Sequence, residues 1–267
     1  MEWAQYLSRG VPPTKRLLIG GNWKCNGTVA EVKKIASILN GCGPLPITNE
    51  IVIAVPSIHL QWCRDNFRKE ILPASENVAV HNGYGAYTGE ISGALLKDFG
   101  VQWTLTGHSE RRVGFEMAGE SSELVGRKTA AALRAGLKVI ACIGEHLHER
   151  EADQTMEVCA SQLSAIVAAV TEADWANIVI AYEPVWAIGT GKVATPQQAE
   201  DTHREIRNWI AQNVSSKVAR SVRIIYGGSV KASNAKSLIS CPNIDGFLVG
   251  GASLLPEFVD IMKVTKQ

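Results

Sequence analysis

Eight short apolar runs recur along this 267-residue chain, and segments with helical spacing separate them. The runs are LLIGGN, EIVIAVP, VAVHN, WTLTG, KVIACIGE, IVIAYEP, VRIIYGGS and GFLVGG. Apolar, β-branched runs without polar alternation are typical of strands buried on both faces. Residues 121–135 show the helical spacing, with Leu124, Val125 and Leu133 on one face. Since alternating strands and helices imply right-handed parallel crossovers, eight units predict an α/β fold, a single-domain (β/α)8 barrel.

An open, doubly wound sheet is the alternative architecture, but the nucleotide-binding motifs that would support it are absent. The segment GTGKVA carries Gly189 and Gly191 without a third glycine, and it follows a loop. It also fails as a phosphate-binding P-loop, because Trp186 and Val193 stand where that motif needs glycine and Ser or Thr. No linker-like segment interrupts the repeat, so we expect an N-terminal extension at 1–16 and one barrel domain at 17–267.

Composition argues against nucleic-acid or membrane partners, so any site for an anion must be local. The net charge is +1, from 27 basic and 26 acidic residues that are well mixed along the chain. Such a chain has no global field to attract nucleic acid or anionic lipid, and no apolar run has the length of a membrane span. The six cysteines are scattered without a Cys-x-x-Cys pair, which favours a reduced, metal-free, cytoplasmic protein.

Polar residues and glycines follow the predicted strands at the points where the strands end. In chain order they are Asn22 and Lys24, Asn82, His108, Glu145, Glu183, Ser229, and Gly250 with Gly251. The carboxyl ends of barrel strands share one rim, and the active sites of barrel enzymes lie there. Residues far apart in the sequence are therefore expected to converge on one site.

The glycine-rich loops of the last three units indicate what that site binds. Glycines let backbone N–H groups approach an anion closely, and phosphate sites in these barrels lie in the loops after strands seven and eight. The segments YGGS (226–229) and VGGAS (249–253) occupy those two loops. Each alone could be only a tight turn, but as neighbours in a barrel they favour a phosphorylated small molecule.

Three side chains at the same rim suit proton abstraction next to a carbonyl group. Taken singly, Glu183 could be a structural acid, Lys24 a solvated lysine and His108 a structural histidine. Together they supply a carboxylate base, a fixed cation and a hydrogen-bond donor, which remove a carbon-bound proton and stabilise the resulting enediolate. This chemistry requires neither a metal nor an organic cofactor.

The motifs GGNWKCNG, GHSERR, AYEPVWAIGTGK, YGGSV and LVGGASL resemble the triosephosphate isomerase family over residues 17–264. The resemblance implies interconversion of dihydroxyacetone phosphate and D-glyceraldehyde 3-phosphate, a step of glycolysis and gluconeogenesis, without a cofactor. It implies that Glu183 is the base and His108 a neutral electrophile. Lys24 is implied as the electrostatic partner of the substrate and Asn22 as a polar contact near it.

The resemblance also implies supporting roles around these residues. Ser109 would hold Glu183 in an open state, and Glu110 would orient Lys24. A lid at residues 184–194 would close over the substrate, held by Tyr226 and Ser229, and would exclude water that promotes side reactions. The implied phosphate contacts are Gly189, Ser229, Gly250 and Gly251.

A homodimer is the assembly that the resemblance implies. Thr88, at the tip of the third loop, would support Asn22 and Lys24 of the partner, and Cys25 would lie in the pocket that receives this loop. The segment NGYGAYT (82–88) is interpreted as a loop shortened by a few residues, with His81 in place of the usual glutamine. A homodimer is still expected, with a weaker or repacked contact.

Two other functions and two local motifs are less consistent with the sequence or have a structural interpretation. A Schiff-base aldolase would need an unprotonated Lys24 amine, which neighbouring acids disfavour, and a binding scaffold would not need the four polar residues at the rim. The segment EHLHERE places His146 and His148 two residues apart, which is not the spacing of a helical zinc pair. Arg111 and Arg112 are predicted to be a structural or interface pair, since no basic stripe extends from them.

Overall fold

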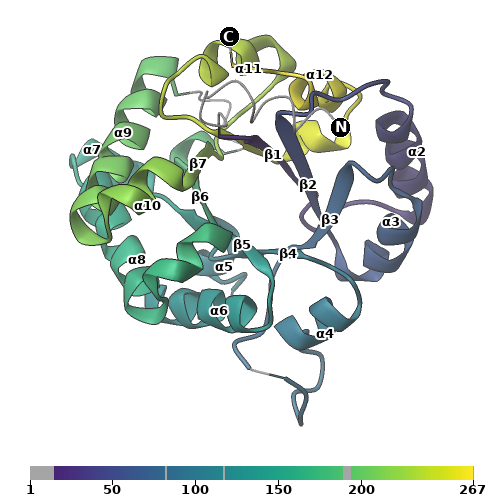
Figure 1. Cartoon of the computed structure of the whole chain (residues 1–267), viewed down its shortest axis with the longest axis horizontal. Coiled ribbons are helices and arrows are strands. Elements are labelled where there is room, and N and C mark those ends of the chain that lie inside the picture. Colours follow the sequence, from purple (N-terminus) through teal and green to yellow (C-terminus); the bar gives the residue numbers. More distant parts are fainter. Residues whose placement is uncertain (1–14, 82, 117, 189–193, 267) are drawn as a thin grey trace, which may run out of the picture.

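Eight parallel strands close into one barrel in the computed structural model, which describes residues 15–81, 83–116, 118–188 and 194–266 (Figure 1). The strands are β1 (Leu17–Asn22), β2 (Asn49–Val55), β3 (Ile71–Ser75), β4 (Trp103–Thr106), β5 (Lys138–Ile143), β6 (Ile178–Tyr182), β7 (Arg223–Tyr226) and β8 (Gly246–Val249). Each strand pairs with the next, and β8 returns to β1 with Phe247 opposite Ile19. The predicted (β/α)8 barrel is therefore confirmed.

Helices surround the barrel on its outside (Figure 1). They are α2 (Val29–Asn40), α3 (Leu60–Asn66), α4 (Gly93–Asp98), α5 (Ser109–Val113), α6 (Ser122–Arg134), α7 (Leu147–Glu151), α8 (Thr155–Ala169), α9 (Pro196–Asn213), α10 (Ser216–Ser221), α11 (Ala232–Ile239) and α12 (Phe258–Met262), with short 3₁₀ turns at η1 (Ser57–His59), η2 (Glu172–Asn177), η3 (Val185–Ala187) and η4 (Gly251–Leu254). The longest, α9, begins where local sequence predicts, with Thr195 as a capping residue before Pro196. Among the described helices, none is long and apolar enough to cross a membrane.

The barrel strands are buried on both faces because two apolar layers enclose them. In β6, Val179 and Ala181 belong to the cluster that fills the barrel, whereas Ile178 and Ile180 belong to the layer under the helices. Successive side chains of a strand point to opposite faces, so this alternation continues to the strand end. Glu183 follows Ala181 by two residues and is directed to the interior side at the mouth.

The third strand differs from the prediction. It is Ile71–Ser75, whereas Val78 and Ala79 are buried in the connection that follows, and Asn82 lies outside the described residues. The apolar character of VAVHN reflects burial under the rim, where the Ala79 N–H donates to the Ile91 carbonyl at 2.9 Å. The connection to α4 therefore covers residues 76–92.

The third loop therefore begins at Glu76, earlier than the sequence predicts. The shortening of NGYGAYT relative to the family stays a prediction. Glu76 and Asn77, and not His81, directly follow the strand. In Figure 1 the connection between β3 and α4 projects from the edge of the barrel, which leaves ample chain for a docking loop.

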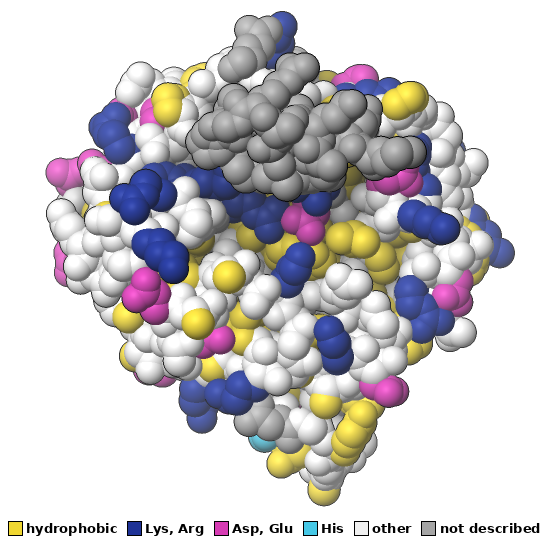
Figure 2. Space-filling model, viewed as in Figure 1, with side chains coloured by type: hydrophobic (Ala, Val, Ile, Leu, Met, Phe, Trp, Pro, Cys, Tyr) yellow, Lys and Arg dark blue, Asp and Glu magenta, His cyan; other side chains and the backbone are white. Residues whose placement is uncertain are grey.

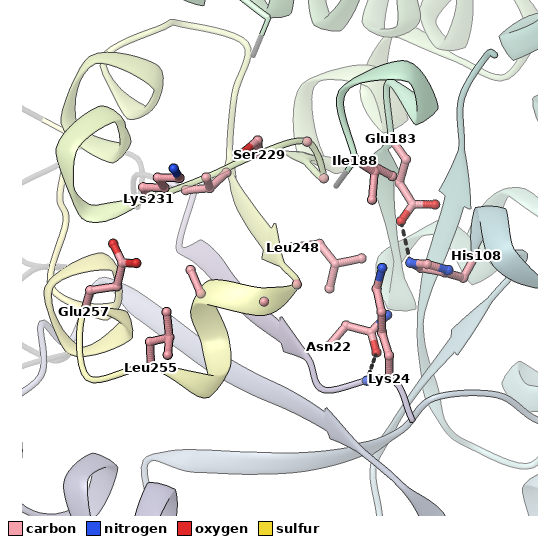
Figure 3. A pocket seen from close by; sticks show the side chains of 16 residues that line it. Asn22, Lys24, His108, Glu183, Ile188, Ser229, Lys231, Leu248, Leu255 and Glu257 are labelled. Atoms are coloured by element: carbon pink, nitrogen blue, oxygen red, sulfur yellow. Dashed lines mark hydrogen bonds and ion pairs between the residues drawn. The ribbon is translucent and has the colours of Figure 1, made fainter. Parts of the chain in front are cut away.

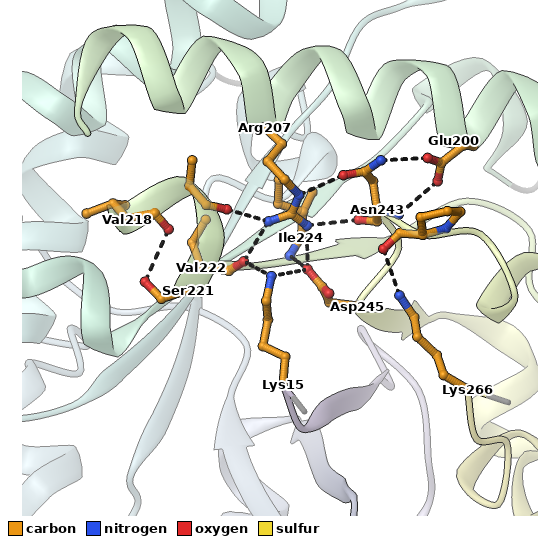
Figure 4. A network of polar contacts seen from close by, with 12 residues as sticks. Lys15, Glu200, Arg207, Val218, Ser221, Val222, Ile224, Asn243, Asp245 and Lys266 are labelled. Atoms are coloured by element: carbon orange, nitrogen blue, oxygen red, sulfur yellow. Dashed lines mark hydrogen bonds and ion pairs between the residues drawn. The ribbon is translucent and has the colours of Figure 1, made fainter. Parts of the chain in front are cut away.

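A network of charged groups joins the chain at the amino end of the barrel (Figure 4). Asp245, directly before β8, accepts hydrogen bonds from the Arg207 guanidinium at 2.6 Å and the Lys15 ammonium at 3.2 Å. The same carboxylate oxygen accepts the Ile224 N–H at 2.9 Å. Arg207 and Lys15 also share the Val222 carbonyl oxygen. The starts of β1, β7 and β8 are thereby tied to α9.

Candidate active site

Asn22 and Lys24 reach the mouth from the end of β1. Trp23 between them is fully buried, and its N–H extends the sheet ladder to the Ala54 carbonyl at 3.0 Å. Lys24 has a φ of +55°, an uncommon left-handed conformation for a lysine, and its N–H donates to the Asn22 side-chain oxygen at 3.1 Å. Its ammonium group forms an ion pair with Glu110 at 2.6 Å. The contact between Glu110 and Lys24 is the one implied by the resemblance.

His108 reaches the mouth from β4 because of the glycine before it. Trp103 and Leu105 point into the barrel, so alternation alone would turn His108 outward. Gly107 has a φ of +66°, a conformation that favours glycine, and it breaks the strand alternation. His108 then lies before α5, where its Nδ1 accepts the Glu110 N–H at 3.2 Å. An acceptor at Nδ1 leaves the proton of a neutral imidazole on Nε2.

Glu183 is buried at the end of β6, with 2% of its surface exposed. One carboxylate oxygen accepts the Ser109 N–H at 3.0 Å, and the other lies 3.0 Å from Nε2 of His108 (Figure 3). A Cβ on Gly227 would approach the Glu183 side chain to 2.8 Å, so the first glycine of YGGS makes room for the carboxylate. Ser109 contacts Glu183 through its backbone, as the resemblance implies.

The pKa of His108 depends on the position of Glu183. Burial of the imidazole lowers this pKa, but the Glu183 carboxylate, and to a lesser degree Glu110, raises it above its ordinary value. The raising effect requires the 3.0 Å contact, so a movement of Glu183 away from His108 removes it. Together with the N–H that Nδ1 accepts, this favours a neutral imidazole once Glu183 has moved.

Glu145, at the end of β5, anchors the chain that leaves β6. Its buried carboxylate oxygen accepts the Trp186 indole N–H at 2.9 Å and the Tyr182 hydroxyl at 3.0 Å, and its backbone carbonyl accepts the Val185 N–H at 3.1 Å. The position of Glu145 after a strand predicts that it lies at the rim, but not that it anchors Tyr182 and Trp186. The signal for this role in the sequence is an acid at a strand end that has no expected contact with the substrate.

The phosphate side of the site is formed by the loops after β7 and β8. Ser229, Gly250 and Gly251 line the same cavity as Glu183. Ser253 holds the second loop, because its hydroxyl donates to the Gly250 carbonyl at 2.6 Å. Gly189, another predicted phosphate contact, lies outside the described residues. Backbone N–H groups of these loops can approach an anion without side-chain obstruction.

One cavity of about 300 Å³ collects most of the predicted site residues (Figure 3). It is lined by Asn22, Lys24, His108, Glu183, Ser229, Gly250 and Gly251, with Ile188, Leu248, Leu255, Lys231 and Glu257 among the residues that complete it. Ser109 and Glu110 support it from α5. A concave cavity with a few convergent polar groups is typical of a small-molecule site.

The remaining predicted residues lie outside the cavity. Tyr226, the last residue of β7, is buried with its hydroxyl close to Gly228. Burial raises the pKa of this hydroxyl to about 12, and the nearby backbone of Ala194 partly offsets the rise. Cys25 and Thr88 are exposed and do not line the cavity. All six cysteines are free thiols. Within the described ranges, no cluster of three or more His, Cys, Asp or Glu side chains could hold a metal.

Arg111 and Arg112 have structural partners. Arg111 forms an ion pair with Glu120 at 2.7 Å, and Arg112 donates to the Gly107 carbonyl at 2.8 Å and the Cys142 carbonyl at 3.0 Å. Arg112 thus fixes the glycine that directs His108. The structural interpretation of this pair is confirmed.

Comparison with known proteins identifies the family of the barrel. The family model described as triosephosphate isomerase matches residues 17–265. The chain is 52% identical over 250 residues to a cytosolic triosephosphate isomerase of Oryza sativa subsp. japonica, an alignment that covers 93% of this chain and 96% of the relative. The predicted family and its isomerase class are therefore confirmed, and the chain belongs to the triosephosphate isomerase family.

Proposed function

We propose that Glu183 is the base that shuttles a proton between the two carbons of a triose phosphate, interconverting dihydroxyacetone phosphate and D-glyceraldehyde 3-phosphate. The observation that carries this proposal is the buried carboxylate, held only 3.0 Å from both the Ser109 N–H and His108 Nε2 at the cavity wall. Both contacts are non-covalent polar interactions at the cavity wall, so a bound substrate can replace them. The carboxylate then turns toward the substrate carbon.

His108 and Lys24 would stabilise the enediolate that forms. When Glu183 leaves, the Nε2–H of His108 is free to donate to a substrate oxygen in its place. Lys24 is held beside the same space by Glu110 and by its strained backbone, and it supplies positive charge without further reorganisation. Asn22 fixes the Lys24 backbone through the 3.1 Å hydrogen bond.

The phosphate group would bind at the opposite end of the cavity. Ser229, Gly250 and Gly251 line the cavity, and Gly189 is proposed to join them when residues 184–194 close over the substrate. Glu145 holds the start of this segment through Trp186, and we propose that Tyr226 holds its far end. Exclusion of water protects the enediolate from loss of phosphate.

The test of this mechanism is Glu183→Gln, which keeps the shape of the side chain and removes the base. We expect kcat to fall by about 10³-fold or more, because a positioned general base typically contributes 10² to 10⁴. Binding of glycerol 3-phosphate, which has the phosphate but no carbonyl, should persist in isothermal titration. The conservative variant Glu183→Asp, which retains a carboxylate, should recover part of the turnover.

Two outcomes would refute the proposed role of Glu183. One is near-normal turnover by Glu183→Gln. The other is loss of glycerol 3-phosphate binding together with loss of the folded baseline in circular dichroism, which would make Glu183 a structural residue. A Schiff-base aldolase is disfavoured, because the Lys24 ammonium is engaged with Glu110 at 2.6 Å and an ammonium is not a nucleophile.

We further propose that the protein is a homodimer, built on the rim loops of β2, β3 and β4. These loops carry several exposed large apolar side chains: Ile58 at 85% exposure, Tyr84 at 68%, Val113 at 62% and Phe115 at 60%. Hydrophobic side chains gather over the projecting loop at the lower edge of Figure 2. Such a grouping is typical of an interaction surface, and Cys25 and Thr88 are exposed near the same rim.

Light scattering across a dilution series tests the dimer, with isomerase activity recorded on the same samples. We expect a mass of twice 28.8 kDa that persists with full activity. The double variant Tyr84→Ser/Phe115→Ser should shift the mass toward 28.8 kDa, whereas Leu147→Ser, an exposed apolar residue after β5, should not. A wild-type mass of 28.8 kDa at all concentrations would contradict the dimer.

The cytoplasmic location predicted from the sequence agrees with that of the cytosolic relative. We also propose the domain division into an extension at 1–16 and a barrel at 17–267, which β1 supports by beginning at Leu17.

A further inference from the structure

The cavity extends beyond the reacting end and contains a second lysine. Figure 3 shows Glu183, His108 and Lys24 at one end and Lys231, Leu255 and Glu257 at the other. Lys231 directly precedes α11 in the loop after β7, two residues beyond Ser229. The resemblance assigned no role to this lysine, and the mechanism above does not use it.

The charges that line the cavity do not by themselves attract an anion. The positive charge of Lys24 is largely cancelled at long range by Glu110 at 2.6 Å, although it still acts on a group in direct contact. Glu183 and Glu257 add carboxylates to the cavity wall. A phosphate monoester carries close to two negative charges at neutral pH, because its second pKa is about 6. An arriving substrate therefore meets paired or repelling charges at most of this wall.

Lys231 is the exception in this distribution of charge. It is exposed, and no acidic side chain in the described part of the chain lies within 4.0 Å of its ammonium group. The nearest lining acid, Glu257, uses one carboxylate oxygen to accept the Ala232 N–H at 3.0 Å. The lysine therefore presents an unbalanced positive charge at the phosphate end of the cavity.

The backbone around Lys231 is fixed to the phosphate loop by one side chain. The Asn234 side-chain oxygen accepts the Lys231 N–H at 2.8 Å, and its amide nitrogen donates to the Ser229 carbonyl at 3.0 Å. Glu257 adds a bond from the loop after β8. Ser229 and Lys231 therefore hold a constant spacing at the rim, so the charge is placed before the substrate arrives.

We propose that Lys231 is a recognition cation for the phosphate dianion, which speeds capture of the substrate and selects dianionic esters without taking part in the chemical step. An unbalanced charge beside a cavity raises the rate of association with an oppositely charged ligand, and dissolved salt screens the effect. The inference rests on the proposed function, because the ligand that it attracts is the phosphate of that substrate.

The test compares Lys231→Gln with wild type over a range of ionic strength. At about 0.01 M, where the Debye length is about 30 Å, kcat/KM should fall about fivefold, and kcat should not change. At about 0.3 M the difference should shrink below about twofold as screening increases. Lys231→Arg, which keeps the charge, should behave as wild type. Competitive inhibition by inorganic phosphate should weaken in Lys231→Gln in parallel.

A matched control separates local from global charge. Lys236→Gln removes the same charge from the exposed last turn of the same helix, away from the cavity. It should leave kcat/KM within about 1.5-fold of wild type at every ionic strength. Equal losses in the two variants would overturn the proposal, as would a lower kcat in Lys231→Gln or an unchanged salt dependence. Absence of isomerase turnover in the wild type would instead refute the proposed function itself.

Discussion

The two ends of the barrel contain the same kinds of charged group but use them differently. At the amino end, Asp245 accepts from Arg207, Lys15 and a backbone N–H, so its contacts serve only to join the starts of strands. At the mouth, the Glu183 carboxylate accepts the Ser109 N–H and contacts His108, and the proposed reaction must break both contacts. Satisfied carboxylates stabilise a fold, whereas a carboxylate with exchangeable contacts can do chemistry.

Uncommon backbone conformations accompany the side chains at the mouth. Lys24, at the mouth, has a φ of +55°, and Gly107, before His108, has a φ of +66°. A non-glycine residue in this region costs about 1–3 kcal/mol and persists only where the surroundings hold it. Positive φ also occurs at the amino end, where Gly246 directly follows Asp245 and has a φ of +141°. The difference is that a non-glycine residue, Lys24, adopts this conformation in the site itself.

The largest test of this contrast is Asp245→Asn, which removes the anion but keeps the shape of the side chain. Arg207 and Lys15 then lose their carboxylate partner, and removal of one member of a buried pair costs about 3 kcal/mol or more. We expect urea unfolding at fixed protein concentration to show this loss. The kcat of the remaining folded enzyme should stay near wild type, because the mouth is untouched.

Asp201→Asn is the matched control for that variant. Asp201 lies on the same helix as Arg207 and pairs with Arg204 at 2.6 Å, but both side chains are well exposed. Exposed pairs contribute about 0–1 kcal/mol, so the urea midpoint of Asp201→Asn should be close to that of wild type. The contrast between the two ends would be wrong if Asp245→Asn reduced kcat strongly while leaving the unfolding midpoint unchanged.

How much of this molecule the sequence could predict is shown by two strands. IVIAY was predicted because its apolar run reflects two buried faces, and alternation then directed Glu183 to the mouth. ILPAS was missed because Pro73 weighs against a central strand, while the buried loop residues Val78 and Ala79 imitate one. Apolar pattern reports burial, and burial is not unique to strands.

Some site residues could be predicted from the sequence and others could not. Asn22, His108 and Glu183 lie at or just after strand ends, so their position alone predicts that they belong to the site. The role of Glu145 could not, since it depends on Trp186 and Tyr182 arriving from another strand. The orientation of His108 also could not be predicted, because the sequence does not show whether the φ of Gly107 is positive or negative.

Glu76, which follows β3 near the mouth, should give a smaller effect: a dependence of stability on pH. Burial raises the pKa of Glu76 to about 7, against opposing contributions from His108 and the Lys24 backbone, and one of its carboxylate oxygens is buried without a hydrogen-bond partner among the described residues. Because the folded pKa exceeds the ordinary value of 4.5, the folded protein keeps a proton that the unfolded chain releases. Stability that is complete below about pH 4.5 is therefore lost as the pH rises to about 7.

Glu76→Gln should remove this dependence, because glutamine is neutral at every pH. We expect equal unfolding free energies for wild type and variant near pH 4.5, and an advantage of about 2 kcal/mol for the variant at pH 8, after allowance for partial exposure of the carboxyl group. Glu90→Gln, at an exposed position in the same loop, should leave the pH profile unchanged. Parallel profiles for wild type and Glu76→Gln would show that the Glu76 carboxyl is satisfied in solution. Glu76 would then not destabilise the folded protein at neutral pH. The contrast between the mouth and the Asp245 network at the amino end would in that case depend on Glu183 alone.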